Sequence, residues 1–90
     1  MSMSGADVAA LRGFASSLRR HQREVEATIQ RLTAIVDSLP WTGADHERFV
    51  DEWRRVHGRA LMTIVAEMSQ ASSQARSHAD RQEQASRRSP

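Results

Sequence analysis

The sequence contains no cysteine, tyrosine or lysine, and only 4% of its residues are aromatic. Without cysteine no disulfide can stabilise the fold, and the redox compartment cannot be inferred. Four glycines and two prolines are too few for a fold of many short strands and turns. The abundant residues are Ala, Arg, Gln, Ser and Glu, a composition typical of long helices. We therefore expect an all-α protein.

The chain is also short, and 90 residues allow a single domain, residues 1–90. A chain of this size buries only about 64% of its unfolded surface, so its own core is marginal. Hydrophobic residues make up 39% and charged residues 27%, which is not the composition of a disordered segment. We expect a chain that folds and gains stability from association.

Positive charge is less abundant than the isoelectric point suggests. The formal net charge is only +2, although the isoelectric point is about 10.9. Every basic residue is arginine, so nothing buffers the alkaline range. The high isoelectric point therefore reflects residue type, and it argues only weakly for a nucleic-acid partner.

Long apolar runs are absent as well. Residues 1–7 have neither a basic leader nor an apolar stretch, and the longest nearly apolar run is residues 60–66. These features predict neither a conventional signal peptide nor a membrane span.

A helix break is predicted around Pro40, because proline disfavours helix in the preceding residue and Gly43 follows closely. Before the break, apolar residues recur every seven positions, which predicts a helix over about residues 7–39 with Ser4 as its cap. The first row of this pattern comprises Leu11, Leu18, Val25, Leu32 and Leu39, beside a second row of Val8, Ala15, Gln22, Ile29 and Val36.

After a turn over residues 40–43, a second helix is expected over about residues 44–84, with Thr42 or Asp45 as its cap. Its apolar positions step by three or four residues. They are Phe49, Trp53, Val56, Ala60, Ile64, Met68, Ala71 and Ala75, broadened by Val50, Leu61 and Val65. Residues 85–90 are expected to be a disordered tail.

Two long helices joined by a short turn form an antiparallel hairpin. Each helix then touches only one other, so the broad apolar stripes stay partly exposed, which normally marks an interface. We therefore expect two hairpins to dimerise into a four-helix bundle. The residues predicted to form the dimer or the hairpin interface are Leu11, Leu18, Val25, Leu32, Phe49, Trp53, Val56, Leu61, Ile64 and Met68.

The turn carries Trp41-Thr42-Gly43, and residues 44–53 read ADHERFVDEW. With this triplet between two amphipathic helices, the chain resembles the WXG-motif (ESAT-6-like) family of small type VII (ESX) secretion system proteins. The resemblance covers essentially the whole chain. It implies a cytoplasmic protein exported as a folded dimer, acting by protein binding as substrate or co-secreted partner. In the family, the turn lies beside the partner's carboxy-terminal tail, and the export ATPase reads this composite surface; that role falls on Trp41 and Gly43.

The residues themselves suggest a simpler role for Trp41, as a hydrophobic lid over the end of the hairpin whose N–H reaches a polar partner. The chain also departs from the family pattern, because the carboxy-terminal Tyr-x-x-x-Asp/Glu export signal has no tyrosine here. Three readings stay open: travel with a signal-bearing WXG partner as a heterodimer, self-association as a homodimer, or a protein that is not exported.

No enzyme, cofactor or metal is predicted. The sequence has no phosphate-binding glycine loop and no nucleophile motif. Histidines and carboxylates nowhere supply three metal ligands at helical spacing, so His21 is interpreted as a partly buried residue that sets helix register. The alternative function is an Arg-rich helical nucleic-acid-binding or scaffold dimer that is not exported. The small net charge argues against nucleic acid.

Overall fold

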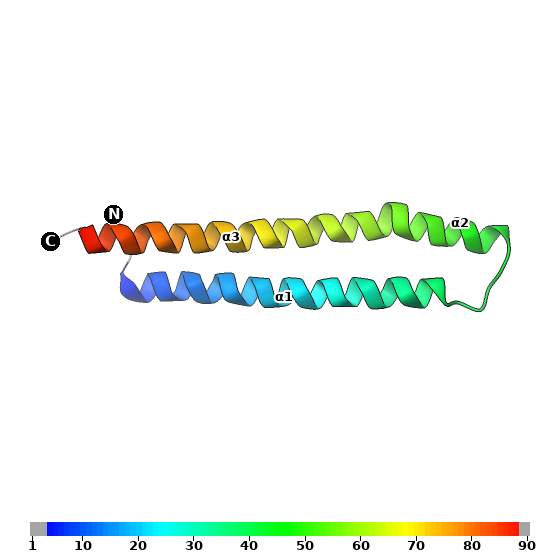
Figure 1. Cartoon of the computed structure of the whole chain (residues 1–90), viewed down its shortest axis with the longest axis horizontal. Helices are drawn as coiled ribbons and strands as arrows, with labels where there is room; N and C mark the ends of the chain where they lie inside the picture. Colours follow the sequence, from blue (N-terminus) through cyan, green and yellow to red (C-terminus); the bar gives the residue numbers. More distant parts are fainter. Residues whose placement is uncertain (1–3, 89–90) are drawn as a thin grey trace.

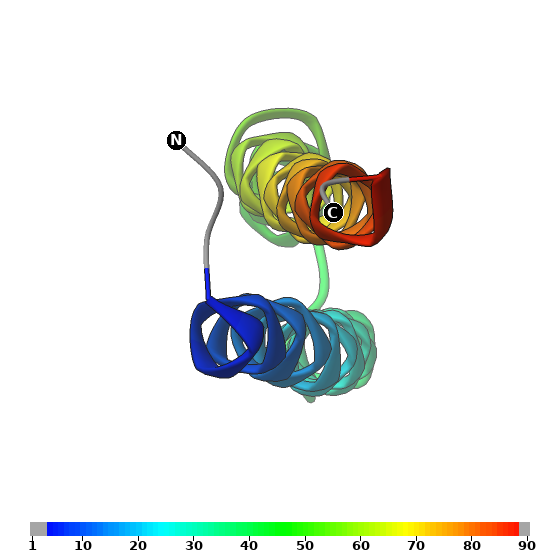
Figure 2. The same ribbon diagram turned by 90° about the vertical axis from the view of Figure 1, so that its left-hand side faces the viewer.

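The computed structural model describes residues 4–88 and confirms an all-α antiparallel hairpin. The first rod is α1 (Gly5–Asp37), and the second consists of α2 (Ala44–Glu52), η1 (Trp53–Gly58) and α3 (Arg59–Arg88). Figure 1 shows the two rods running side by side, with the start of α1 near the end of α3. Viewed end on, no third layer covers them (Figure 2).

The start of α1 follows the expected cap. Ser4 Oγ accepts a hydrogen bond from the Asp7 backbone N–H at 3.2 Å, and the Asp7 carboxylate accepts from the Ser4 backbone N–H at 3.2 Å. This reciprocal capping box satisfies two backbone donors that the first helical turn leaves free. The helix ends at Asp37, three residues before Pro40, so it spans Gly5–Asp37 where about 7–39 was expected.

The cap predicted for the second helix is wrong. Neither Thr42 nor Asp45 caps α2; Gly43 is the N-cap residue, and no side chain hydrogen-bonds there. Gly43 has φ of 109°, a left-handed conformation that glycine adopts without steric cost. Its carbonyl accepts from the Glu47 backbone N–H at 3.1 Å, so the glycine both turns the chain and starts the helix.

The far end of the second rod extends beyond the expected limit. We predicted a helix to about residue 84 and a disordered tail over residues 85–90, but α3 continues through Arg88. Arg87 pairs with Glu83 at 3.1 Å, and basic residues in the last turn favour the helix dipole. Residues 89 and 90 lie outside the described residues.

The core is a single narrow seam between α1 and α3. Ala15, Ser72 and Ala79 are fully buried, and Ser72 Oγ donates a hydrogen bond to the Ala15 carbonyl at 2.9 Å. Such small side chains let the two backbones approach closely. The remaining buried residues are Val8, Ile29, Val36, Val65 and Ala75.

This seam does not make a globular core. A compact chain of 90 residues has a radius of gyration of about 12 Å, whereas that of the hairpin is 20.1 Å. The molecule measures 71 × 16 × 12 Å, and neither α2 nor η1 contributes a buried residue. Much of the apolar surface is therefore left for other contacts.

Candidate partner-binding face

One long side of the hairpin is apolar. On α1, two rows at heptad spacing flank the buried row Val8, Ala15, Ile29 and Val36 on the same side, because positions three and four residues apart share a helix face. Residues of α3 continue this surface across the seam. We define the apolar face as Leu11, Phe14, Leu18, Val25, Leu32, Ile35, Leu61, Ile64 and Met68.

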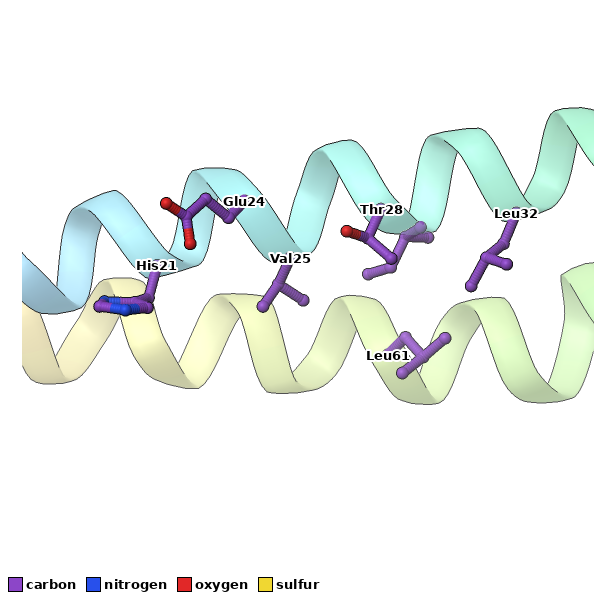
Figure 3. Close-up of a pocket in the computed structure, with 7 residues that line it drawn as sticks. His21, Glu24, Val25, Thr28, Leu32 and Leu61 are labelled. Carbon is purple, nitrogen blue, oxygen red and sulfur yellow. The ribbon is translucent and has the colours of Figure 1, made fainter.

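A groove runs along the middle of the apolar face. Figure 3 shows Val25 and Leu32 of α1 and Leu61 of α3 pointing toward one another across the seam. The groove has a volume of about 350 Å³, and His21 and Glu24 form its polar end. A hollow lined by aliphatic side chains of both helices is the shape into which a further apolar helix packs.

Large side chains on this face meet solvent. Phe14 is 55% exposed, Ile35 56% and Ile64 49%. The chain as a whole exposes 6684 Å², whereas a compact monomer of 10.1 kDa exposes about 5,300 Å². The excess of about 1,400 Å² is larger than the roughly 800 Å² that each partner buries in a standard interface.

The predicted interface residues divide into two groups in the hairpin. The half-buried residues are Leu11, Leu18, Val25, Trp53, Leu61 and Met68. Exposed residues, which remain for another chain, are Leu32, Phe49, Val56 and Ile64. The sequence alone did not make this division, because it does not specify which heptad row faces the second rod.

At the turn, Trp41 packs against α2. Its ring centroid lies 5.6 Å from that of His46 and 5.8 Å from that of Phe49, while 43% of the residue stays exposed. The expected hydrogen bond is missing: within residues 4–88 the Trp41 indole N–H has no partner. Trp41 therefore presents both an apolar surface and a free donor at the hairpin tip.

The histidine assigned to the seam is also placed differently. His21 is exposed, and its Nδ1 lies 2.7 Å from the Ser17 carbonyl of its own helix. Gln22 occupies the next position and is half-buried, with Nε2 donating to Glu26 at 3.4 Å. The interpretation of His21 as a partly buried, register-setting residue is thus wrong, because the buried heptad row passes through Gln22.

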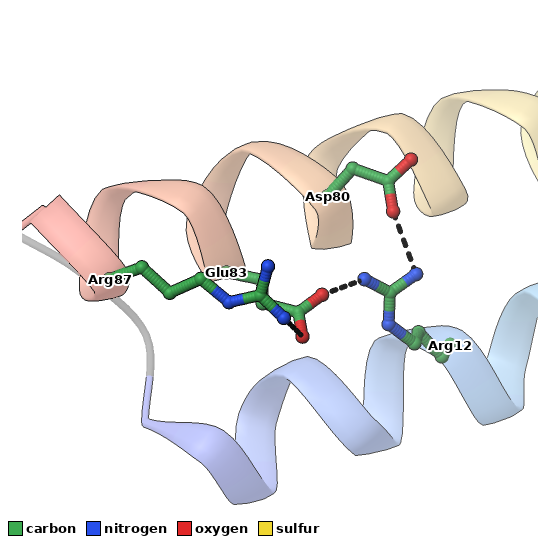
Figure 4. Close-up of polar contacts among 4 residues, drawn as sticks. All are labelled: Arg12, Asp80, Glu83 and Arg87. Atoms are coloured by element: carbon green, nitrogen blue, oxygen red, sulfur yellow. Dashed lines mark hydrogen bonds and ion pairs between the residues drawn. The ribbon is translucent and has the colours of Figure 1, made fainter.

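The other long side of the hairpin is polar, and we call it the polar face. Arg12 of α1 pairs with Asp80 at 2.8 Å and with Glu83 (Figure 4). Hydrogen bonds to these two carboxylates raise the pKa of Arg12. The polar face comprises Arg12, Ser16, Arg19, Arg23, Glu26, Thr33 and Asp37 of α1 with Trp53, Arg54, Met62, Arg76, Asp80 and Glu83 of the second rod.

Near the turn, the polar face is held by two further contacts between the rods. Arg54 pairs with Asp37 at 2.6 Å, and the hydrogen bond to this carboxylate raises the pKa of Arg54. The Trp53 indole N–H donates to Thr33 Oγ1 at 3.0 Å. All the ion pairs that join the two rods within the described part of the chain lie on this face.

Sequence reasoning missed the π-helical turn η1, which begins at Trp53 and ends at Gly58. Single π turns within α-helices recur at functional positions and shift the phase of the helix. The only signal in the sequence was a glycine inside the expected helix, and a Cβ at Gly58 would lie 3.3 Å from the Trp53 carbonyl oxygen.

Neither metal clusters nor membrane-spanning helices are found in the described residues. Residues 4–88 contain no group of three or more His, Cys, Asp or Glu side chains placed to hold a metal ion. Over the same span no helix combines the length and hydropathy needed to cross a bilayer.

No protein-family model, curated protein or solved structure matches this chain. The fold and the exposed apolar face therefore rest on the chain's own residues, and the family resemblance rests on the turn motif and its placement.

Proposed function

We propose that this protein acts by binding other helical chains through the apolar face, without bond chemistry. The observation that carries the proposal is the exposed apolar face with its groove of about 350 Å³. A single hairpin leaves this surface in water, where each exposed Å² of apolar area costs about 25 cal/mol relative to burial. A second hairpin laid on the groove makes a four-helix bundle and removes that cost.

The partner proposed first is a similar hairpin, either a second copy or another WXG-like protein. The apolar face is chemically complementary to a second copy of itself, since all the side chains that define it are hydrophobic. The polar face stays in solvent in such a bundle.

We further propose that the protein belongs to a type VII (ESX) secretion system and is exported as the folded dimer, from the cytoplasm and without signal-peptide cleavage. Trp41 and Gly43 at the hairpin tip support this proposal. The half-exposed indole with its unpaired N–H offers both a contact surface and a donor to a partner's tail or to the export ATPase. These 90 residues contain no tyrosine, so a Tyr-x-x-x-Asp/Glu signal would have to come from a different WXG protein in a heterodimer and not from a second copy.

Two measurements test these proposals, the oligomeric mass of the purified chain and its export from cells. Sedimentation of the purified chain is expected to give the mass of a dimer, alone or with a co-expressed WXG partner. Trp41→Ala is expected to retain helix content and dimer mass, since Trp41 is outside the seam, but to abolish export by cells carrying the secretion system. A compact monomer at every concentration, with and without the partner, contradicts the binding proposal. Undiminished export of Trp41→Ala contradicts the role of the turn.

A further inference from the structure

Two arginines of α1, one heptad apart, lie on the polar face, but the residues opposite them on α3 differ in charge. Arg12 of α1 faces Asp80 and Glu83 of α3. Because the rods are antiparallel, the equivalent positions one heptad further along lie seven residues later on α1 and seven earlier on α3. This register places Arg19 opposite Ser73 and Arg76, and Arg19 and Arg76 line the same cleft. At these two positions serine and arginine stand where Arg12 has aspartate and glutamate.

Without acidic residues opposite Arg19, the cleft between the rods is basic. Its volume is about 240 Å³, and it is lined by Ser16, Arg19, Arg20 and Arg23 of α1 with Arg76 of α3. Within residues 4–88 none of these four arginines forms an ion pair, in contrast to Arg12. The Arg19 Nε is shielded from solvent and has no acceptor. A buried donor without a partner is costly, and four clustered positive charges repel one another.

We propose that this cleft is an anion-binding site for a compact polyphosphate, meaning a diphosphate or triphosphate group that is free or carried by a nucleotide. Guanidinium groups bind phosphate oxygens through paired N–H donors in a planar fork. An oxyanion in the cleft gives the Arg19 Nε its missing acceptor, neutralises the facing Arg76, and lies within reach of the Ser16 hydroxyl.

The extent of the positive charge favours a compact ligand over a nucleic-acid backbone. The cleft residues of α1 span positions 16–23, about 10 Å of helix, and the volume corresponds to about eight water molecules. On one side Arg12 is already neutralised by two acids, and on the other Glu26 follows at the same heptad position as Arg19. No aromatic side chain lines the cleft, so a nucleotide base has no stacking surface.

The site is independent of the proposed dimer. It lies on the polar face, whereas the groove of the proposed dimer lies on the apolar face. The anion site is therefore open in the monomer and in the bundle, and neither proposal requires the other.

Calorimetric titration of the full-length chain with pyrophosphate tests the proposal. Arg76→Gln removes one of the four guanidinium groups and is expected to weaken binding about tenfold to a hundredfold. The matched control is Arg31→Gln, which removes the same charge from an exposed position of α1 outside the cleft and is expected to change the affinity less than about twofold. ATP is expected to bind about as tightly as pyrophosphate.

A charge reversal provides a second measurement, the thermal midpoint with and without pyrophosphate. Arg76→Glu restores at Arg19 the pairing that Arg12 makes with Glu83, so it is expected to raise the thermal midpoint without ligand and to abolish stabilisation by pyrophosphate. Circular dichroism checks that each variant keeps its helix content.

Several results would overturn the site. They are no binding of pyrophosphate, equal weakening by Arg76→Gln and Arg31→Gln, or a lowered thermal midpoint for Arg76→Glu. Duplex DNA binding that pyrophosphate does not compete would assign the arginines to an extended phosphate backbone instead. Failure of any of these measurements leaves the mass and export results unaffected, so the two proposals can be told apart.

Discussion

The two long sides of this hairpin belong to the same pair of rods, but they differ in how their side chains are paired. The polar face joins the rods by directional contacts, namely Arg12 with Asp80 and Glu83, Arg54 with Asp37, and Trp53 with Thr33. The apolar face has no such pairs and leaves side chains such as Phe14 and Ile35 more than half exposed. The polar face thus joins the two rods by contacts within the chain, whereas the apolar face leaves large side chains in solvent.

This difference shows where a hairpin without a globular core obtains its specificity. Directional contacts on one side set the pairing of the two rods, and the small buried residues Ala15, Ser72 and Ala79 set their close approach. Hydrophobic area on the other side is non-directional and remains available for association. The contrast between the faces therefore separates the interactions that define the hairpin from those that assemble it.

The largest expected effect comes from placing charge on the apolar face. Leu18→Arg or Ile64→Arg is expected to abolish dimerisation, because burying an unpaired charge in the interface costs several kcal/mol. Met62→Arg is the matched control, since Met62 is 47% exposed but lies on the polar face. Sedimentation equilibrium gives the masses. An unchanged dimer mass for the two apolar-face variants, or dissociation by Met62→Arg, would show that the interface lies elsewhere.

A smaller effect is expected from the hydrogen bond between Trp53 and Thr33. Trp53→Phe removes the indole donor, and its loss is expected to cost about 1 kcal/mol and to lower the thermal midpoint by about 4–8 °C. Circular dichroism on heating measures this shift.

Thr33→Val removes the other partner of the same hydrogen bond. If the bond is real, the double variant costs clearly less than the two single variants combined. Strict additivity would mean that the 3.0 Å contact contributes nothing. Dimer mass is expected to stay unchanged in all three variants, because the bond lies on the polar face.

Much of the fold followed from the sequence because local signals agreed with one another. The break before Gly43, the Ser4 cap and the heptad spacing of α1 each rest on interactions within a few residues. The choice of the buried row did not follow, because it depends on how closely two helices approach. The sequence left open which apolar residues hold the hairpin together, and in the structure Ala15 and Ala79 are fully buried in the seam, since small residues allow the closest packing.

The π turn and the basic cleft could not be predicted from the sequence, because both depend on how the two rods lie against each other. Trp53 read as one more apolar position of a regular helix, and only its reach across to Thr33 in the folded hairpin shows its polar role. Arg19, Arg20 and Arg23 were visible as a basic patch on α1. Their juxtaposition with Arg76, 53 or more positions away, required the register of the two rods.

The smallest effect is expected from the ion pair between Arg54 and Asp37. Both side chains are substantially exposed, 58% and 40% respectively, so water and salt screen their attraction. Arg54→Gln is expected to lower the thermal midpoint by less than Trp53→Phe does. The difference from the unmodified chain should vanish in about 1 M salt, where screening acts within about 3 Å. A shift that persists at high salt would show that Arg54 stabilises the hairpin through packing of its aliphatic stem and not through charge.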